Sequence, residues 1–356
     1  MITLRCDVAV VGAGPAGSTA AWTAARAGAT VVLLDRRREI GLPVQCAEYV
    51  PRQLADHAPW SPECVVQTIT AMRSHLPDGE AVQTLGPGYM IHRWRFDQHL
   101  AWAAHEAGAE VWPRTKAVEP TAKGLLARRD KQDVAIEARV IVGADGPRST
   151  VGKWIGQINV KLLIGAQCTV AVKRQTEVTE VYFDPVYDGG YGWFFPKKAQ
   201  ANVGVGLRSK DARRAREALQ HLLDRLEIGR AGVVSYTGGL IPVGGPLGRT
   251  WQDNIILVGD AAGQTHPITG AGVAYACLCG EIAGRVAAQA ARENDLSVLA
   301  AYEQEWRDFL GGALGHATAK RRFMEAHWSA DPQELSAVLR QSWVAFPAYS
   351  RRAPHS

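Results

Sequence analysis

A glycine-rich loop close to the N-terminus constrains the fold of this chain more than any other feature. Gly12-Ala-Gly-Pro-Ala-Gly17 directly follows a short apolar run, Asp7–Val11, and precedes an alanine-rich helical stretch, Ser18–Ala27. A second apolar run, Thr30–Leu34, comes after the glycine that closes this helix. Short apolar runs of this kind are typical of buried parallel strands. The segment therefore predicts a strand–helix–strand unit with a tight loop at the start of its helix.

The residues of this loop suit the binding of a dinucleotide. Gly12 permits a tight turn, Gly14 lets a pyrophosphate approach the backbone, and Gly17 lets helix and strand pack closely. Ala16 lies in the same phosphate-binding turn. The start of the helix adds unpaired N–H groups and a positive dipole end. Asp35 ends the second strand, 23 residues after Gly12, close to the spacing expected for the acid that binds a ribose.

The rest of the chain contains two kinds of strand pattern. Val140–Val142 and Asn254–Val258 are again buried strands that run into glycine-rich turns, whereas residues 164–207 contain short strands separated by Gly, Pro and Asp. We therefore predict an α/β fold: a Rossmann-like domain assembled from separated pieces, an inserted antiparallel β-sheet domain and a helical C-terminal tail. The expected parts are 1–160 (cofactor domain, first part, with 60–100 contributing to the substrate side), 161–250 (sheet domain), 251–295 (cofactor domain, last part) and 296–356 (helical region).

Several smaller elements are expected as well. The pattern predicts helices over His99–Ala107 and Ala271–Ala291, and a charged amphipathic helix over Ala212–Leu226. Leu125–Arg129 and Asp133–Ala138 are typical of a β-hairpin.

Composition excludes several classes of protein. The 356 residues carry a net charge of +5, from 40 basic against 35 acidic residues spread along the chain, which does not favour nucleic-acid binding. The six cysteines form no C-x-x-C pair, so we expect free thiols and neither a disulfide framework nor a metal site. No signal peptide and no run of about 18 apolar residues is found. We expect a cytoplasmic protein, with a peripheral membrane contact left open.

Two later stretches distinguish FAD from NAD. Gly143-Ala-Asp-Gly-Pro-Arg-Ser149 and Val258-Gly-Asp-Ala-Ala-Gly263, with Pro267–Gly272 after it, resemble two signatures of the para-hydroxybenzoate-hydroxylase-like FAD superfamily. The resemblance covers nearly the whole chain in the right order. It implies an FAD-binding domain of the GR2/PHBH type, in which Asp145 and Asp260 contact the cofactor. Asp260 matches the acid that binds a ribityl hydroxyl in that family.

The same resemblance implies further contacts to FAD. A helix starting near Gly270 would point its N-terminus at the pyrimidine ring of the flavin, with Ala271 and Gly272 at the contact. Reduced flavin carries negative charge near N1 and O2, which a helix N-terminus stabilises. Arg93 matches the first residue of the family's R-x-x-F-D pattern and would contact the cofactor. The alternative is that Arg93 forms an ordinary ion pair on the surface.

A second nucleotide-binding unit is not found in the sequence. Gly204-Val-Gly206 and Gly244-Gly245 lack the helix that a dinucleotide loop requires. We therefore expect FAD to be reduced by a transiently bound NAD(P)H or by an electron-transfer protein.

An aromatic motif points to the substrate. Tyr191-Gly-Trp-Phe-Phe-Pro196 is followed after seven residues by Gly204-Val-Gly206. This resembles the Y-x-W-x-F-P…G-x-G pattern of the geranylgeranyl reductase family, which saturates isolated double bonds of isoprenoid chains with reduced FAD. Alternate residues of a strand share a face, so Tyr191, Trp193 and Phe195 would form one aromatic wall for a large apolar substrate. The alternative is that these rings only fill the core between the domains.

The loop after the second strand supplies candidate catalytic residues. It begins with the basic stretch Arg36–Arg38, and we assign Arg36 to the cofactor. Reductases of the family commonly have a cysteine near the flavin at the position of Cys46. A thiol there can donate a proton after hydride transfer, or it can be a small packing residue. Glu48 is a second candidate acid on the same loop.

The sequence therefore predicts an FAD-dependent oxidoreductase. The first hypothesis is reduction of C=C bonds in an isoprenoid or another large apolar substrate. The alternative is an FAD-dependent monooxygenase that hydroxylates an aromatic substrate, including a Trp side chain of a partner protein, because fold does not decide between these reactions. A non-enzymatic flavin-binding module is a distant third. No G-x-S-x-G or H-E-x-x-H motif supports a hydrolase or a metalloenzyme.

Overall fold

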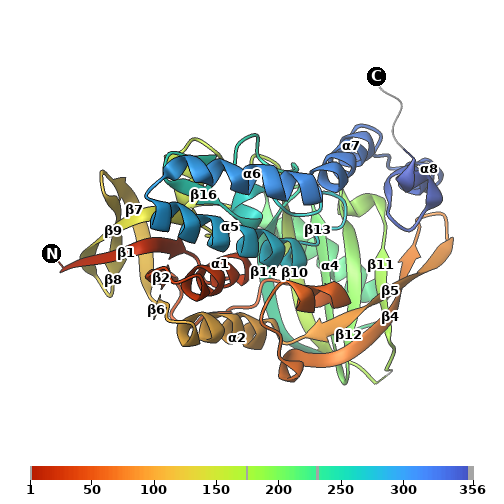
Figure 1. Ribbon diagram of the computed structural model, residues 1–356. Helices are drawn as coiled ribbons and strands as arrows, with labels where there is room; N and C mark the ends of the chain where they lie inside the picture. The colour runs from red at the N-terminus through yellow and green to blue at the C-terminus, as the bar shows by residue number, and fades with distance from the viewer. Residues whose placement is uncertain (1, 174, 230–231, 352–356) are drawn as a thin grey trace.

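The computed structural model describes residues 2–173, 175–229 and 232–351. Within these ranges the chain forms two large sheets, sheet A at the left of Figure 1 and sheet B at the right. The last residues of the predicted helical tail, 352–356, lie outside the described residues.

Sheet A contains the predicted strand–helix–strand unit. Its main path is β15-β16-β9-β1-β2-β6, in which β16, β9, β1, β2 and β6 are parallel neighbours, and the hairpin β7–β8 joins it through β9. The strands are β1 (Ile2–Val11), β2 (Val31–Leu34), β6 (Glu110–Trp112), β7 (Thr115–Thr121), β8 (Gly124–Arg129), β9 (Gln132–Gly143), β15 (Trp251–Gln252) and β16 (Ile255–Leu257). The predicted hairpin is confirmed by the antiparallel pairing of β8 with β9.

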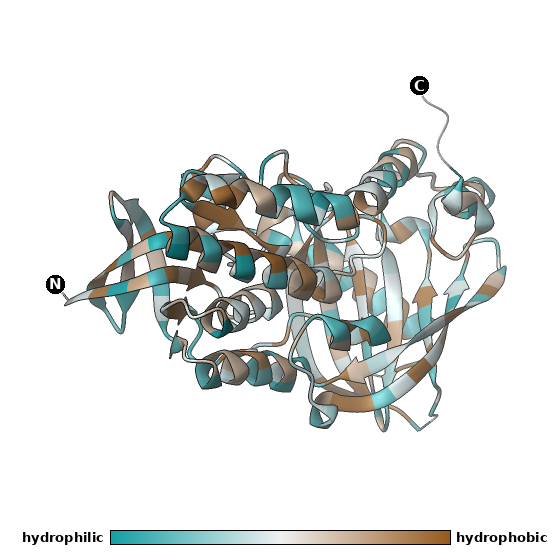
Figure 2. Ribbon diagram, in the orientation of Figure 1, coloured by the Kyte–Doolittle hydropathy of each residue, from teal (hydrophilic) through white to brown (hydrophobic). Residues whose placement is uncertain are grey.

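Both faces of sheet A are covered, which explains the unbroken apolar runs in its strands. Val8 and Val10 pack under the helices α1, α2 and α5, whereas Ala9 and Val11 face a second cluster on the opposite side. In Figure 2 the hydrophobic colour concentrates on the interior strands, and the hydrophilic colour lies on outward turns of the covering helices. The loops at the carboxyl ends of the central strands are therefore where a ligand can bind.

The helices account for the remaining layers (Figure 1). They are α1 (Pro15–Arg26), α2 (Arg93–Glu106), α3 (Thr150–Trp154), α4 (Ala212–Arg225), α5 (Val273–Glu293), α6 (Ala300–Trp306), α7 (Gly312–Ala326) and α8 (Pro332–Ser342), with a π-helical turn, η7 (Arg307–Gly311), between α6 and α7. Short 3₁₀ turns are η1 (Arg52–Asp56), η2 (Pro62–Cys64), η3 (Pro185–Tyr187), η5 (Gly259–Ala262), η6 (Leu296–Leu299) and η8 (Pro347–Ser350).

One helix boundary was predicted wrongly. The helix expected over His99–Ala107 begins at Arg93, six residues earlier. Its first turn holds a buried ion pair between Arg93 and Asp97, which stabilises this turn and cannot be recognised from hydrophobic periodicity alone.

Sheet B has the order β14-β10-β13-β12-β11-β4-β5-β3. Its strands are β3 (Tyr49–Pro51), β4 (Val65–His75), β5 (Ala81–Ile91), β10 (Leu162–Ala171), β11 (Val178–Tyr182), β12 (Tyr191–Lys197), β13 (Gln200–Leu207) and β14 (Val233–Pro242). The sheet was expected to be antiparallel and to come from residues 161–250. It also includes β4 and β5, from the residues 60–100 that were expected to contribute to the substrate side. The short strand β3 was not expected, and the pair β4–β11 is parallel. The strands β4 and β11 come from chain segments far apart in sequence. The direction of their pairing therefore depends on how the chain enters the sheet and not on local residues.

The two faces of sheet B differ in what covers them. Helix α4 packs its buried leucines on one face, against residues of β10 and β13. The other face carries an aromatic cluster from β12 that packs against residues of α7 and α8. Among the described residues, no helix is both long and apolar enough to cross a membrane.

Candidate active site

The glycine loop forms a cradle at the end of β1. Gly12 has a φ of +106°, and a Cβ there would lie 2.4 Å from the carbonyl oxygen of Ala144. A Cβ on Gly17 would lie 1.8 Å from the carbonyl oxygen of Gly12, so helix and loop touch at this position. Gly14 differs from both, because a Cβ there would have no described heavy atom within 4 Å apart from its chain neighbours. Gly14 thus leaves open space at the helix start.

The N-terminus of α1 faces this open space without a partner of its own. Gly14 is the N-cap, the helix has no side-chain cap, and no acidic residue occupies its first turn. Uncapped N–H groups and the helix dipole together favour an anion such as a pyrophosphate. Gly14 and Ala16 would hold that part of the cofactor.

Asp35 lies at the edge of the cradle, as predicted. The backbone N–H of Ala13 donates to its Oδ2 at 2.9 Å, and that of Arg37 donates to its Oδ1 at 2.7 Å. These bonds fix the carboxylate beside the glycine loop, where it would accept from a ribose hydroxyl. Arg36 is exposed, whereas Arg37, which the sequence did not single out, donates to Gln45 at 3.0 Å.

Arg93, the first residue of α2, forms a buried ion pair near Cys46. Its guanidinium makes two bonds to Asp97, Nε–Oδ1 at 2.9 Å and Nη2–Oδ2 at 3.0 Å, and both side chains are largely buried. The exposed surface ion pair considered from the sequence is therefore wrong. Burial raises the pKa of the nearby Cys46 thiol, while the Arg93 charge opposes this rise. Cys46 consequently carries its proton at neutral pH.

Glu48 does not have the free carboxyl group expected of a catalytic acid. It is 5% exposed, and its Oε2 accepts from Lys197 Nζ at 2.5 Å and from Asn202 Nδ2 at 2.8 Å. Its Oε1 accepts from the backbone N–H of Arg93 at 2.9 Å. The backbone N–H of Glu48 in turn donates to Cys46 Sγ at 3.2 Å. These contacts make Glu48 a positioning residue that ties the Cys46 loop to β12, β13 and α2.

Sheet B holds the same loop through further side chains. Gln167 donates to the carbonyl oxygen of Cys46 at 3.1 Å, and Thr237 donates to that of Val44 at 2.7 Å. Gln45 donates to the carbonyl oxygen of Gly238 at 2.6 Å. Cys46 therefore lies on a loop fixed between the two sheets. None of the partners from sheet B was predicted, because a lone Gln or Thr in a strand carries no sequence signal.

The second predicted FAD stretch lies at the start of α5. Asp260 follows β16, accepts from Thr265 Oγ1 at 2.6 Å, and has its pKa raised by burial. A Cβ on Gly272, the N-cap of α5, would lie 3.3 Å from Asp260 Oδ1. Like α1, α5 has neither a side-chain cap nor an acid in its first turn. The helix begins at Val273, so Gly270 and Ala271 lie in the loop that leads into it.

His266 shapes that loop as a neutral side chain. Burial lowers its pKa to about 4. Its Nδ1 accepts from the backbone N–H of Thr269 at 3.2 Å, and its Nε2 lies 3.1 Å from the hydroxyl of Tyr349. A neutral imidazole avoids a positive charge in the loop before α5, where it would compete with the helix dipole for an anion.

Asp145 has a structural role that the sequence did not indicate. Its Oδ1 accepts from Ser149 Oγ at 2.5 Å, and its Oδ2 accepts from the backbone N–H of Thr150 at 2.6 Å. These bonds organise the N-terminus of α3. The contact of Asp145 with a cofactor stays a prediction.

The predicted aromatic residues do share one face of β12. Tyr191, Trp193 and Phe195 all belong to the aromatic cluster, with the rings of Tyr191 and Trp193 6.1 Å apart. Tyr191 pairs with Gly206 across the strands, and Trp193 pairs with Gly204. A Cβ on Gly204 would lie 2.4 Å from the Trp193 ring. Gly204 thus makes room for the Trp193 ring, whereas a Cβ on Gly206 would make only ordinary contacts at 3.7 Å.

We predict that Trp193→Phe destabilises the protein. Trp193 is only 7% exposed, and its Nε1 donates to Gln167 Oε1 at 3.0 Å. The smaller ring leaves a void and an unpaired buried amide oxygen, so the free energy of unfolding should fall by about 1–3 kcal/mol. Thermal or urea unfolding measures the change. Trp102→Phe is the control, because Trp102 is exposed and should tolerate the change; equal stability of the two variants would contradict the packing described.

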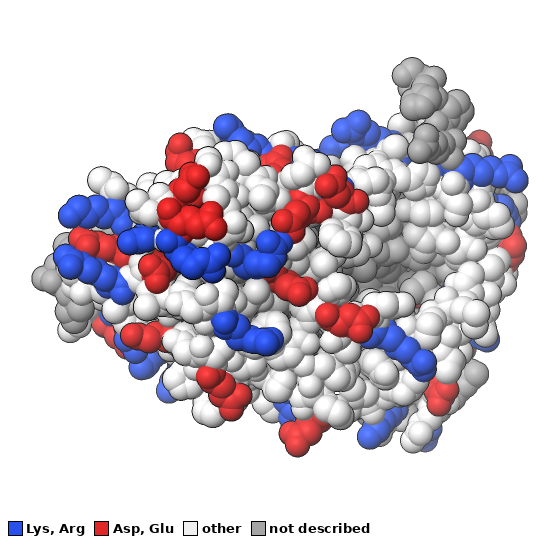
Figure 3. All heavy atoms as spheres, in the orientation of Figure 1, with Lys and Arg blue, Asp and Glu red and all other residues white. Residues whose placement is uncertain are grey.

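A hollow opens on the molecular surface on the side where sheet B lies in Figure 1. Figure 3 shows it at the right, and the atoms around its mouth are mostly white, with Lys, Arg, Asp and Glu at its margins. A hollow with few charged side chains at its mouth suits an apolar ligand.

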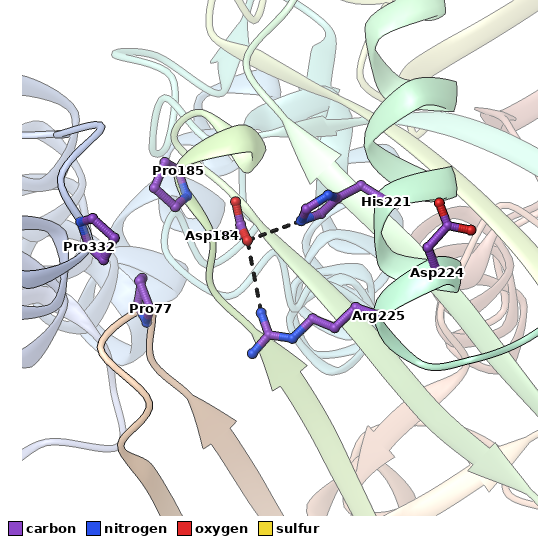
Figure 4. A pocket seen from close by; sticks show the side chains of 7 residues that line it. All are labelled: Pro77, Asp184, Pro185, His221, Asp224, Arg225 and Pro332. Atoms are coloured by element: carbon purple, nitrogen blue, oxygen red, sulfur yellow. Dashed lines mark hydrogen bonds and ion pairs between the residues drawn. The ribbon is translucent and has the colours of Figure 1, made fainter.

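A separate surface pocket lies near the N-terminus of α8 (Figure 4). It has a volume of about 400 Å³ and is lined by Pro77, Asp184, Pro185, His221, Asp224, Arg225 and Pro332. Asp184 pairs with His221 at 3.1 Å and with Arg225 at 4.0 Å. Its charged side chains thus largely neutralise one another, and none of the predicted site residues lies in it.

The glycine loop, the uncapped starts of α1 and α5, and Asp35 together form a site of the kind that binds a dinucleotide cofactor. The sequence pattern of FAD-dependent oxidoreductases matches residues 7–145. The open space at Gly14 and the uncapped starts of α1 and α5 fit FAD. The chain is an FAD-dependent oxidoreductase, and its cofactor is FAD.

Comparisons with known proteins give the particular family. The pattern of the geranylgeranyl reductase catalytic domain matches residues 163–241, and that of lycopene cyclase matches residues 207–340. A digeranylgeranylglycerophospholipid reductase of Methanopyrus kandleri is 37% identical over 94% of this chain and 90% of its own length. One of Methanothrix thermoacetophila is 38% identical over 90% of this chain and 88% of its own. The chain belongs to the geranylgeranyl reductase family.

Solved structures agree on the fold. A geranylgeranyl bacteriochlorophyll reductase-like protein from Thermoplasma acidophilum superimposes with a TM-score of 0.84 at 24% identity, covering 96% of this chain and 97% of its own. A probable FAD-dependent monooxygenase from Pseudomonas aeruginosa gives a TM-score of 0.69 at 19% identity, over 94% and 99% of the two chains. A myxobacterial halogenase gives 0.72 at 19% identity, over 88% and 81%. Since the same fold serves these different proteins, it does not select a reaction.

Proposed function

We propose that this protein reduces C=C bonds of isoprenoid chains with reduced FAD. The observation that carries the proposal is the aromatic strand β12, whose rings face a loop that holds a protonated cysteine. Relatives that are 37% and 38% identical are digeranylgeranylglycerophospholipid reductases. A lipid of that kind is our proposed substrate.

The chemistry requires a hydride and a proton. When bound, reduced FAD supplies the hydride to one carbon of the double bond. Cys46 Sγ supplies the proton to the other carbon, so two C–H bonds form as the π bond is lost and the flavin is oxidised. The raised pKa of Cys46 keeps the proton on sulfur until it is needed. Glu48 and Arg93 position this thiol. Tyr191, the most exposed of the three rings, contacts the isoprenoid chain, while Trp193 and Phe195 form the buried part of the same wall and exclude water.

Cofactor contacts are proposed for the predicted residues that lie around the cradle. Gly14 and Ala16 hold the pyrophosphate in a cradle that Gly12 and Gly17 shape. Asp35 binds the ribose, and Asp260 with Gly270, Ala271 and Gly272 contacts the flavin end. The described residues contain no second loop of this type, which supports reduction of FAD by a transiently bound NAD(P)H or an electron-transfer protein. We propose that the protein works in the cytoplasm at a membrane surface, where an isoprenoid lipid is located.

A single-turnover experiment tests the proposal. Photoreduced protein without oxygen is mixed with a geranylgeranyl lipid, and the return of oxidised-flavin absorbance is followed. The absorbance should return with this lipid and not with its fully saturated counterpart. Cys46→Ser should retain FAD and slow the return by about 10²-fold, the usual contribution of a positioned acid. Equal rates for Cys46→Ser and the wild type would remove Cys46 from the mechanism, and no return with any polyprenyl lipid would reject the proposed function.

The alternative is a monooxygenase acting on an aromatic substrate, free or carried by a partner protein. It is supported by the fold that the chain shares with the monooxygenase and the halogenase. The identity to these proteins is 19%, about half that to the reductases, so reduction is the function we favour.

A further inference from the structure

Arg321 on α7 is a buried arginine whose guanidinium is only partly used by the protein. Arg321 is 1% exposed, and its Nε donates to Glu325 Oε1 at 2.7 Å. Among the residues that the structure describes, neither Nη1 nor Nη2 has a hydrogen-bond partner. Buried polar groups are almost always paired, and an unpaired cation is the most unfavourable case. An acceptor from outside the described chain is therefore expected.

The charges around Arg321 do not balance. Lys161 donates to the same carboxylate, Glu325, at 3.0 Å, and Arg208 is paired with Asp188 at 2.8 Å. Three cations thus share two carboxylates. Burial lowers the pKa of Arg321, and the Glu325 carboxylate only partly offsets this effect. One further negative charge would complete the cluster.

The unpaired edge of Arg321 lies beside the aromatic cluster. Met324, three residues later on the same face of α7, belongs to that cluster together with Tyr191. Burial raises the pKa of Tyr191, and the Arg321 charge opposes this rise. A Cβ on Gly189 would lie 3.3 Å from Nη2, which means that the glycine before β12 keeps side-chain atoms away from this edge.

We propose that Nη1 and Nη2 of Arg321 bind a phosphate group, and that an amphipathic ligand places its phosphate there and its apolar chain along the aromatic cluster. The two N–H groups on one edge of a guanidinium match two oxygens of a phosphate. The proposal rests on the proposed function for the apolar chain and adds the residue that binds the charged end. The phosphate can belong to a lipid head group or be free inorganic phosphate.

Binding to the FAD-loaded protein tests this without turnover. Geranylgeranyl phosphate, geranylgeraniol and inorganic phosphate are titrated separately, and tryptophan fluorescence and flavin absorbance report binding. The wild type should bind the phosphate ester roughly tenfold more tightly than the alcohol, as expected for one charge-assisted pair. Arg321→Gln should bring the two affinities within about twofold while leaving that for the alcohol unchanged. Arg322→Gln is the control, since Arg322 is exposed on the same helix.

Arg321→Lys keeps the experiment decisive if Arg321→Gln does not fold. Lysine retains the charge but lacks the paired N–H edge, so the preference for the ester should fall to roughly threefold. An ester preference close to one in the wild type, or one unchanged in both Arg321 variants, would overturn the proposal. Inorganic phosphate binding as tightly as the ester would assign the site to free phosphate and not to a lipid head group. Reduction of geranylgeraniol tests the proposed function separately, because the alcohol needs no phosphate site.

Discussion

Replacing Glu48 with alanine is expected to lower the free energy of unfolding by about 3–5 kcal/mol, the range for removing one partner of a buried ion pair. The carboxylate is paired with Lys197, which is 8% exposed, and it also accepts from Asn202 and from the backbone of Arg93. Alanine would leave the Lys197 ammonium and two further donors without an acceptor in the interior. Urea unfolding of the purified FAD-loaded protein measures the loss.

The double variant Glu48→Ala/Lys197→Met separates the charge effect from loss of packing. Methionine removes the stranded ammonium and retains much of the apolar stem, so the double variant should be more stable than Glu48→Ala alone. Arg340→Gln is the control, because Arg340 pairs with Asp78 and Glu80 in a partly exposed cluster worth about 0–1 kcal/mol. A Glu48→Ala loss no larger than that of the control would contradict a positioning role for Glu48.

Gly14→Val is expected to weaken FAD binding strongly without destabilising the apoprotein. The backbone of Gly14 is extended, with φ −81° and ψ −175°, a conformation that valine adopts readily. The Cβ position has no described neighbour within 4 Å, so the new side chain would occupy only the space we assign to the pyrophosphate. Overpacking of that space should weaken FAD binding by on the order of a hundredfold, or about 3 kcal/mol. Apoprotein stability should change by no more than about 0.5 kcal/mol.

Gly17→Ala provides the contrast for this prediction. Its Cβ would overlap the carbonyl oxygen of Gly12, so this variant should lower the stability of the apoprotein as well as FAD content. Gly315→Ala on α7, where a Cβ also meets open space, should leave FAD content unchanged and should not lower apoprotein stability, because alanine favours a helix. The measurements are flavin absorbance after purification and melting of the apoprotein. Normal FAD content in Gly14→Val would show that the cradle is not the cofactor site.

Local pattern was sufficient for the elements of the cofactor domain. The glycine loop, the acid at the end of β2 and the β8–β9 hairpin each depend on residues close together in sequence, and all three form where expected. The alternation in β12 also placed three aromatic side chains on one face. In each case the feature follows from the period of a strand or from the backbone freedom of glycine.

The tertiary contacts of the site could not be predicted in this way. Glu48 was expected to be a candidate acid, but it is held by Lys197 and Asn202, about 150 residues away in sequence. The strand β3 and the parallel pairing of β4 with β11 were not expected, since strand pairing across the sheet depends on the path of the whole chain. No motif found in the sequence includes Arg321. Its two buried Nη atoms without a partner distinguish it from the other arginines that the structure describes.

The mass of the product tests the central claim most directly. The FAD-loaded protein is incubated with a geranylgeranyl lipid and a chemical reductant, once without oxygen and once in air, and the lipid is analysed by mass spectrometry. Reduction predicts the gain of two hydrogen atoms for each double bond consumed, without oxygen and with Cys46 intact. A product that gains one oxygen atom, and that forms only in air, would contradict isoprenoid reduction and favour the monooxygenase.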